Sequence, residues 1–313
     1  MIEVDHLTKV FGSVTAVDDV SFRAAAGEAI GLLGPNGSGK TTIMRTLAGY
    51  FPPTSGRVAV AGIDVTAAPL AARAAVGYLP ETATWYPELR VAEFLGLCAD
   101  VRGLRGARRR ARLAAVLEGC GLADVSRRLI GALSKGFKQR LGMAQALLHE
   151  PAVLILDEPT VGLDPRQVVE IRAVVRALRG RTTVLFSTHI LSEVATVCDR
   201  VVIIDRGRLV AEERAAPLAR TGQDAGRLLV RVVGPAAAVL AALAGLAEVA
   251  AVETQPSDDG SVHLVVTAQP AAAPTNAVAA AVLAHGWRLE ELRPLTPSLE
   301  ELFVRLTARG AAR

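Results

Sequence analysis

Residues 34–41 constrain this chain more than any other segment, because they match the pattern G-x-x-x-x-G-K-[ST] without a mismatch. The apolar run 29–33 before them predicts a buried strand, and residues 42–48 after them predict the start of a helix. Glycines let a backbone curl so that several N–H groups point at one anion, and a helix N-terminus adds partial positive charge. The segment therefore predicts an α/β fold with a phosphate-binding loop at the end of one strand.

The loop residues are the first candidates for nucleotide binding. They are Gly34, Pro35, Asn36, Gly37, Ser38, Gly39, Lys40 and Thr41, with Thr42 next in the chain. In such a loop the lysine reaches the terminal phosphates of a nucleoside triphosphate and the hydroxyl that follows it holds Mg²⁺. We therefore expect Lys40 to bind ATP phosphates and Thr41 to be a metal ligand.

A second candidate segment ends in two carboxylates. Residues 152–156 form a continuous apolar run, which is typical of a parallel strand buried on both faces, and Asp157 and Glu158 follow it. Asp157 is expected to act on the metal, and Glu158 to polarise the attacking water as a general base. A second such run at 182–187, with helical periodicity between the two, supports an α/β sheet.

Composition excludes several classes of protein. A net charge of +4 is too small for a dedicated nucleic-acid binder, so no nucleic-acid partner is expected. The 3 cysteines are widely spaced and favour a reducing compartment. The sequence holds neither an apolar stretch of ~20 residues that could span a bilayer nor an apolar signal core at its start, so we expect no secretory signal and no transmembrane segment.

Further motifs occur in a fixed order around these two segments. A serine-headed string, Leu133, Ser134, Lys135, Gly136 and Phe137, lies upstream of the strand that ends in Asp157 and Glu158. Asp164 follows that strand within residues 162–165, His189 follows the next apolar run, and Phe11 lies near the start of the chain. With these motifs the chain resembles the ATP-binding subunit of an ABC transporter over residues 1–215.

The resemblance implies a role for each motif. The fold would be a P-loop NTPase with a RecA-like core, an antiparallel β subdomain and a helical subdomain at about residues 82–148. Residues 133–137 would be the signature and Asp164 would lie in the D-loop, both completing the ATP site of a second ATPase subunit, identical or related, in a head-to-tail dimer. His189 would contact the γ-phosphate as a catalytic residue, and Phe11 would stack on adenine.

Four positions depart from the family's common pattern. Glu81 stands where many members have glutamine, and its carboxylate can still ligate Mg²⁺ directly or through water. Lys135 replaces glycine and Phe137 replaces glutamine, whereas the phosphate-contacting Ser134 and Gly136 are kept. Phe11 in place of tyrosine keeps a stacking face and loses a hydroxyl.

The Glu81 variant, residues 134–140 and the tail at 295–303 resemble the ATPases of ABC-2-type exporters of the gliding-motility and multidrug type. The resemblance implies a separate integral-membrane permease and a peripheral location on the cytoplasmic face of the membrane. Residues 82–94, with Trp85 and Tyr86, either form part of the permease groove or pack into the local core. The sequence does not identify the exported substrate.

Two alternatives to transport are a soluble ABC ATPase and a P-loop regulatory switch. A soluble ABC ATPase of DNA repair would carry long coiled coils, and one of translation usually holds two ATPase units, whereas this sequence has no such heptad runs and one phosphate-binding loop. A P-loop regulatory switch would need neither a signature nor a D-loop. The motifs therefore favour an ATPase that energises export.

The rest of the chain predicts a second domain. A length of 313 residues suggests two domains. The pattern loosens at 216–226, which predicts a linker. Residues 227–313 then alternate as βαββαβ, the order of a small ferredoxin-like sandwich, before a last helix at 298–308. The arginine-dense segment 102–112 is expected to be a solvated helical face or loop.

Overall fold

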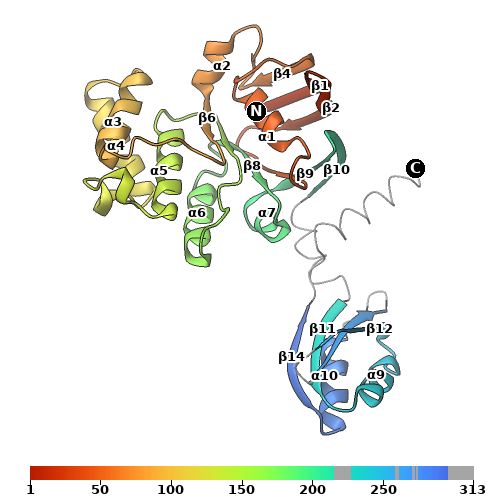
Figure 1. The fold of residues 1–313 in the computed structure, drawn as a ribbon. Coiled ribbons are helices and arrows are strands. Elements are labelled where there is room, and N and C mark those ends of the chain that lie inside the picture. Colours follow the sequence, from red (N-terminus) through yellow and green to blue (C-terminus); the bar gives the residue numbers. More distant parts are fainter. Residues whose placement is uncertain (215–226, 258–260, 270–271, 273, 295–313) are drawn as a thin grey trace. The chain divides into compact units, whose positions relative to one another are not determined.

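The computed structural model describes residues 1–214, 227–257, 261–269, 272 and 274–294. The chain divides into two compact units, Met1–Ala215 and Ala216–Arg313, and each is described by itself (Figure 1). The predicted linker at 216–226 and the predicted last helix at 298–308 lie outside the described residues.

An antiparallel sheet of four strands belongs to the first unit, with the order β2-β1-β4-β5. Its strands are β1 (Ile2–Phe11), β2 (Val14–Ala24), β4 (Ser55–Val60) and β5 (Ile63–Asp64). Val4 of β1 lies opposite Phe22 of β2 on one side and Val58 of β4 on the other, so apolar side chains share one face of this sheet. An antiparallel sheet is thus present, as the resemblance implied.

The second sheet of this unit has six strands in the order β10-β9-β3-β8-β7-β6. They are β3 (Ala29–Leu33), β6 (Val76–Leu79), β7 (Val153–Leu156), β8 (Thr183–Thr188), β9 (Arg200–Asp205) and β10 (Arg208–Arg214). Neighbours from β9 to β6 pair in parallel, and β10 is antiparallel to β9. Every residue of β3, β7 and β8 is buried, which accounts for the apolar runs of β3 and β7 and the apolar centre of β8.

Helices connect the strands of the six-stranded sheet. They are α1 (Lys40–Leu47), α2 (Pro69–Ala75), α3 (Val91–Val101), α4 (Gly106–Gly119), α5 (Lys135–Leu147), α6 (Pro165–Ala177) and α7 (Leu191–Val197), with short 3-10 turns at Ala123–Val125 and Ile130–Ala132. Helices α3, α4 and α5 lie together at one end of this unit (Figure 1) and contact one another, so the helical stretch predicted in this region is confirmed. No described helix is long and apolar enough to cross a membrane.

Two arginines of the segment 102–112 also join the helices of this group. Arg109 of α4 donates from Nε to Asp100 of α3 over 2.9 Å. Arg112 donates to the carbonyls of Leu147 and Leu148 at the end of α5 over 2.9 and 3.1 Å. A guanidinium suits a helix C-terminus because the last carbonyls there lack helical partners. Residues 102–112 are mostly exposed, as expected, and Arg109 and Arg112 in addition have specific structural partners.

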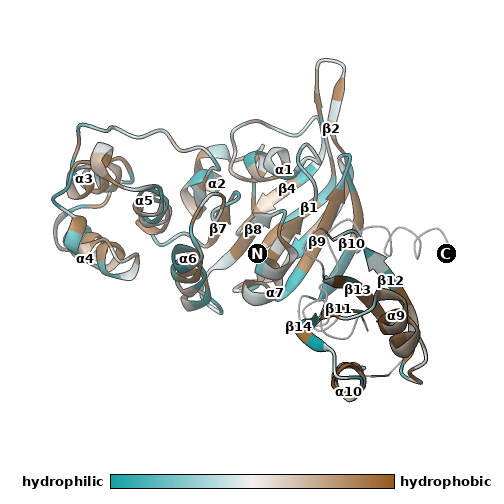
Figure 2. Cartoon of the chain, turned by 60° about the horizontal axis from the view of Figure 1, so that its bottom comes forward, coloured by the Kyte–Doolittle hydropathy of each residue, from teal (hydrophilic) through white to brown (hydrophobic). Residues whose placement is uncertain are grey.

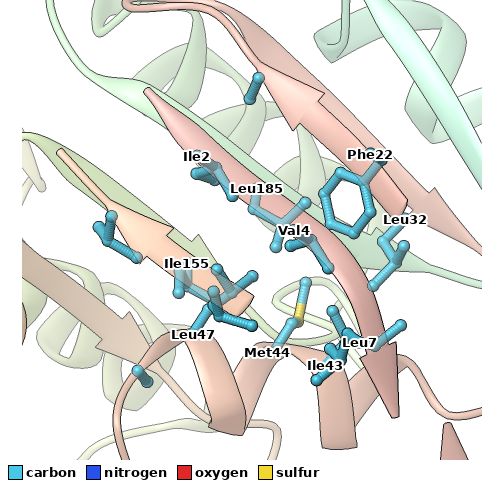
Figure 3. Packing of buried hydrophobic residues seen from close by; sticks show 14 of the residues in the cluster. Ile2, Val4, Leu7, Phe22, Leu32, Ile43, Met44, Leu47, Ile155 and Leu185 are labelled. Carbon is cyan, nitrogen blue, oxygen red and sulfur yellow. The ribbon is translucent and has the colours of Figure 1, made fainter. Parts of the chain in front are cut away.

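The core of the first unit fixes helix α1 against both sheets. Ile43, Met44 and Leu47 of α1 are fully buried and pack in one cluster with residues of both sheets, including Val4 and Leu185 (Figure 3). Burying an aliphatic side chain of this size stabilises a fold by about 1.5–3 kcal/mol. The helix that follows the phosphate-binding loop is thus anchored along its length, which holds its N-terminus in place.

The second unit has the predicted βαββαβ order. Its elements are β11 (Arg227–Val233), α9 (Ala236–Ala244), β12 (Val249–Gln255), β13 (Val262–Ala268), α10 (Thr275–Ala284) and β14 (Arg288–Pro294). The strands form an antiparallel sheet in the order β12-β13-β11-β14. Helices α9 and α10 are largely apolar (Figure 2), and their Val239 and Val278 pack with Val230 of the sheet in a core of their own.

Candidate active site

The phosphate-binding loop leaves the carboxyl end of β3 and enters α1, as the sequence predicted. Gly37 and Gly39 have φ values of +78° and +104°, which glycine adopts without the strain that a side chain adds. A Cβ on Gly34 would lie 2.1 Å from the carbonyl oxygen of Ile204, and one on Gly39 would lie 2.7 Å from that of Ala16. Close approach of neighbouring backbone therefore requires glycine at both ends of the loop.

Lys40 lies under the loop and is only 5% exposed. Its Nζ donates to the carbonyls of Gly34 over 2.7 Å and Pro35 over 3.0 Å, and it lies 3.9 Å from Oε1 of Glu158. Burial lowers the pKa of Lys40, against the opposing effect of the charges of Glu158 and Asp157. The ammonium group is held at the base of the loop, on the side of the two carboxylates.

The carboxylates Asp157 and Glu158 lie directly after β7 and share one partner on β8. Ser187 Oγ donates to Asp157 Oδ1 over 2.8 Å, and the backbone N–H of Glu158 donates to the same Oγ over 2.8 Å. Thr41 Oγ1 also donates to Asp157 Oδ1, over 3.3 Å. Thr41, Asp157 and Glu158, which the sequence linked to the metal or the attacking water, thus lie together, and Ser187, which no sequence motif indicated, joins the two carboxylates.

Glu158 has an unusual backbone and an unusual carboxyl group. Its φ is +47°, in the left-handed region that a non-glycine residue rarely occupies. His189 Nδ1 lies 3.0 Å from Glu158 Oε2. Burial raises the pKa of Glu158, and the hydrogen bond and charge of His189, followed by the charge of Lys40, oppose that rise. The pKa values of Lys40 and Glu158 both move toward the neutral forms, because burial outweighs their attraction across 3.9 Å.

A cavity of about 240 Å³ opens between the loop and the carboxylates. It is lined by Ala16, Asn36, Gly37, Ser38, Gly39, Lys40, Thr41, Thr42, Glu81 and Glu158. Ser38 Oγ, Asp157 Oδ2 and Glu158 Oε1 are buried at or beside it, and none has a hydrogen-bond partner. Unpartnered buried oxygens are costly. Together with Thr41 and Glu81 they form an all-oxygen set of the kind that Mg²⁺ prefers, so the residues fit that ion.

Signature and D-loop residues do not line this cavity. Ser134 caps α5, where its side chain accepts from the N–H of Phe137 over 3.5 Å, and Asp164 caps α6 by accepting from the N–H of Gln167 over 3.0 Å. A Cβ on Gly162 would lie 2.2 Å from Lys135 Nζ, so the ammonium group of Lys135 lies against the D-loop glycine. The two helix starts are therefore packed together, on elements separate from the phosphate-binding loop.

Phe11 is 46% exposed and also lies outside the cavity lining. Its ring meets that of Phe51 edge to face, with centroids 5.2 Å apart, and Lys9 Nζ lies 5.0 Å from each centroid. The sequence analysis singled out neither Phe51 nor Lys9. Their packing holds the Phe11 ring at the surface, where a flat ligand can stack on it.

The chain is similar in sequence to known proteins. Residues 17–161 match the ABC transporter family. The chain is 37% identical over 310 residues to the daunorubicin resistance ATP-binding protein DrrA3 of Streptomyces coeruleorubidus, covering 98% of this chain and 95% of that protein. It is 34% identical to the linearmycin resistance ATP-binding protein LnrL of Bacillus subtilis, covering 99% of both. This chain belongs to the ATP-binding proteins of ABC transporters.

A third relative and a solved structure agree with the assignment to ABC transporters. The Nod factor export ATP-binding protein I of Paraburkholderia xenovorans is 36% identical over 98% of this ABC ATPase and 97% of its own length. The dimeric ATP-binding cassette MJ0796 bound to ADP and Pi superposes with a TM-score of 0.63 at 25% identity, over 69% of this chain and 99% of that one. The predicted family is confirmed, and so is the predicted function: the chain is the ATP-binding subunit of an ABC exporter and hydrolyses ATP to energise transport.

Proposed function

We propose that residues 34–42, Asp157, Glu158 and His189 form one site that binds MgATP and hydrolyses it. The observation that carries this proposal is the cavity at the end of β3 and β7, where Lys40 lies 3.9 Å from the carboxylate of Glu158 and three buried oxygens lack partners. N–H groups of the loop would surround the phosphates, and Lys40 would neutralise the terminal one. Bound there, Mg²⁺ would neutralise charge on the β- and γ-phosphates, held by Thr41 and Asp157 with Glu81 beside them.

Glu158 is proposed to accept the proton of the attacking water. Its raised pKa brings the carboxylate nearer to the working pH, which favours proton transfer. His189 would hold Oε2 of Glu158 through the 3.0 Å contact and meet the γ-phosphate with its other nitrogen. Phe11, supported by Phe51, would stack on adenine.

A second ATPase subunit is proposed to complete this site. Ser134, Gly136 and the N-terminus of α5 offer a hydroxyl, N–H groups and partial positive charge, and none of them lines the cavity of the same chain. In a head-to-tail dimer they would bind the γ-phosphate of the partner, with Asp164 at the same junction. The dimeric MJ0796 cassette supports this arrangement.

The chain is further proposed to act with a separate membrane permease of the ABC-2 type, at the cytoplasmic face of the membrane. Both aromatic residues predicted near the permease groove contact the Phe94 ring, with centroids 5.7 Å away for Trp85 and 6.4 Å for Tyr86, but Trp85 is half-buried whereas Tyr86 is 54% exposed. Tyr86 would therefore contact the permease, with Trp85 supporting it from the local core.

A cavity of about 380 Å³ beside the end of α1 and β6 is a further candidate for permease docking. It is lined by Ala48, Gly49, Tyr50, Arg73, Val76, Tyr78, Arg102 and Gln145. Arg73 and Arg102 bring two positive charges, and no carboxylate is among these lining residues. Tyr50 in this lining is 65% exposed. An apolar permease segment with an acidic side chain would complement this surface.

The proposed domain division is an ATPase domain at 1–215, a linker at 216–226 and an accessory domain at 227–313. We propose that the accessory domain is a ferredoxin-like sandwich. The order β12-β13-β11-β14, with antiparallel neighbours throughout, supports this topology.

Nucleotide binding and permease binding are tested separately. In the full-length chain, Lys40→Ala should weaken MgATP binding at least tenfold, while Arg110→Ala, at an exposed cation of α4, should leave it unchanged. Affinity purification from membranes should recover the permease with the wild type but not with Tyr86→Ala. Val169→Ala, at an exposed apolar residue of α6, serves as the control. Equal recovery with Tyr86→Ala would remove the proposed contact while leaving the nucleotide site untouched.

A further inference from the structure

Glu193 in the first turn of α7 is a buried carboxylate that the site described above does not use. The residue is 3% exposed. Its Oε2 accepts from Thr160 Oγ1 over 2.7 Å and from Thr188 Oγ1 over 2.9 Å. Its Oε1 lies 3.7 Å from Arg172 Nη2. A carboxylate in such surroundings is tolerated only when donors compensate for the water it has lost, and here two hydroxyls and a guanidinium do so.

The three partners of Glu193 come from segments that the proposed mechanism uses. Thr160 lies in the segment between Glu158 and Asp164, and Arg172 lies on α6, the helix that Asp164 caps. Thr188 directly precedes His189. The buried side chain of Glu193 thus joins three segments: the one that follows Glu158, the one that contains His189, and helix α6.

Hydrogen bonds around Thr188 also fix the backbone on both sides of His189. Thr188 Oγ1 accepts from the N–H of Ile190 over 3.0 Å while it donates to Glu193. The N–H of Glu193 in turn donates to the carbonyl of Ile190 over 3.2 Å. These bonds close a turn around His189, whose Nδ1 lies 3.0 Å from Glu158.

Ser187 and Glu193 together tie β7 to β8 on two sides of the general base. Ser187 binds Asp157 and the N–H of Glu158, on the side of the metal ligands. Glu193 binds Thr160 and Thr188, on the side that leads to the D-loop. Releasing Glu193 would leave the phosphate-binding loop intact, because none of its partners lines that cavity.

We propose that Glu193 is a positioning residue for ATP hydrolysis, which holds His189 against Glu158 and fixes the D-loop segment 160–164 to the same anchor. This inference rests on the proposed roles of Glu158 and His189. Because Glu193 holds both segments, His189 and the segment proposed to face the partner subunit change position together. A misplacement of about 1 Å at catalytic groups can cost on the order of 100-fold in rate.

The test measures steady-state hydrolysis by the full-length chain in the variants Glu193→Gln, Thr188→Val and Thr188→Ser. Glutamine keeps the size of Glu193 but removes its charge and presents an amide N–H₂ to Arg172. Valine keeps the shape of Thr188 without its hydroxyl, and serine restores the hydroxyl. Glu118→Gln, at an exposed residue of α4, is the matched control. Thermal unfolding of each variant is followed alongside.

We expect Glu193→Gln and Thr188→Val each to lower kcat about tenfold or more, with the KM for MgATP changed less than twofold. Thr188→Ser should recover kcat, and the double variant Glu193→Gln/Thr188→Val should be no slower than the slower single variant. The proposal would be overturned if either single variant had the kcat of the control, or if its loss of activity came from a higher KM. It would also be overturned if the two losses of kcat multiplied in the double variant. Absence of hydrolysis by the wild type would instead refute the proposed function, so the two failures are distinguishable.

Discussion

Ser187 offers the most quantitative test of how the site is held together. Its Oγ accepts from the N–H of Glu158 and donates to Asp157, both over 2.8 Å, and the residue is fully buried. Ser187→Ala leaves the N–H of Glu158 without a partner, at about 1–3 kcal/mol, and removes a hydrogen bond to a charged group, worth about 1.5–3 kcal/mol. Asp157 Oδ1 keeps Thr41 as a donor, so we expect a net loss of about 3 kcal/mol.

The assay is urea unfolding of the first unit followed by Trp85 fluorescence. The chain has 2 tryptophans, Trp85 and Trp287, and a Trp287→Phe background leaves Trp85 as the single reporter. A loss of about 3 kcal/mol lowers the urea midpoint by roughly 1–3 M at typical slopes of about 1–3 kcal/mol/M. Ser126→Ala is the matched control, because its hydroxyl also donates a hydrogen bond but lies at the surface. A Ser187→Ala midpoint within 0.3 M, roughly the scatter of such measurements, of that control would refute the reasoning.

Two further predictions use the same unfolding assay. Gly34→Ala should destabilise the first unit by about 3 kcal/mol and abolish MgATP binding, because the new Cβ would lie 2.1 Å from the carbonyl oxygen of Ile204. Gly119→Ala on α4, where a Cβ meets nothing within 4 Å, should instead stabilise it by about 0.5 kcal/mol, and equal effects would contradict the account. Burial, aided by the charge of Arg102, lowers the pKa of His149 from 6.5 to about 4. The unfolded chain therefore binds the proton first, so stability should fall as the pH drops from 6.5 toward 4, and His149→Gln should reduce that slope. An unchanged slope in the variant would contradict the assignment to His149.

How much of the site can be predicted from sequence depends on whether its parts are local. The phosphate-binding loop is one continuous segment, and Asp157 and Glu158 follow directly on an apolar run, so spacing alone identifies both. Ser134 and Asp164 could be recognised as helix starts because capping involves residues close in sequence. The elements of the second unit followed in the same way from apolar runs separated by turn residues.

Contacts between distant segments were not visible in the sequence. Ser187 and Glu193 act on partners about thirty residues away, and only the parallel pairing of β7 with β8 brings them together. The positive φ of Glu158 likewise has no local signal in the sequence. Neither could the sequence decide between core and surface for Trp85 and Tyr86, since adjacent aromatic residues at the end of a loop carry no periodicity.

The central claim is that two copies of this site close on shared nucleotide, and the state of assembly of Glu158→Gln tests it most directly. This variant keeps the shape of the site and removes the proposed general base, so bound ATP should persist. At saturating MgATP, light scattering should report a species of twice the 32.7 kDa chain mass, and omission of the nucleotide should return the monomer. A variant that stays monomeric with MgATP, both alone and together with its membrane permease, would contradict the account.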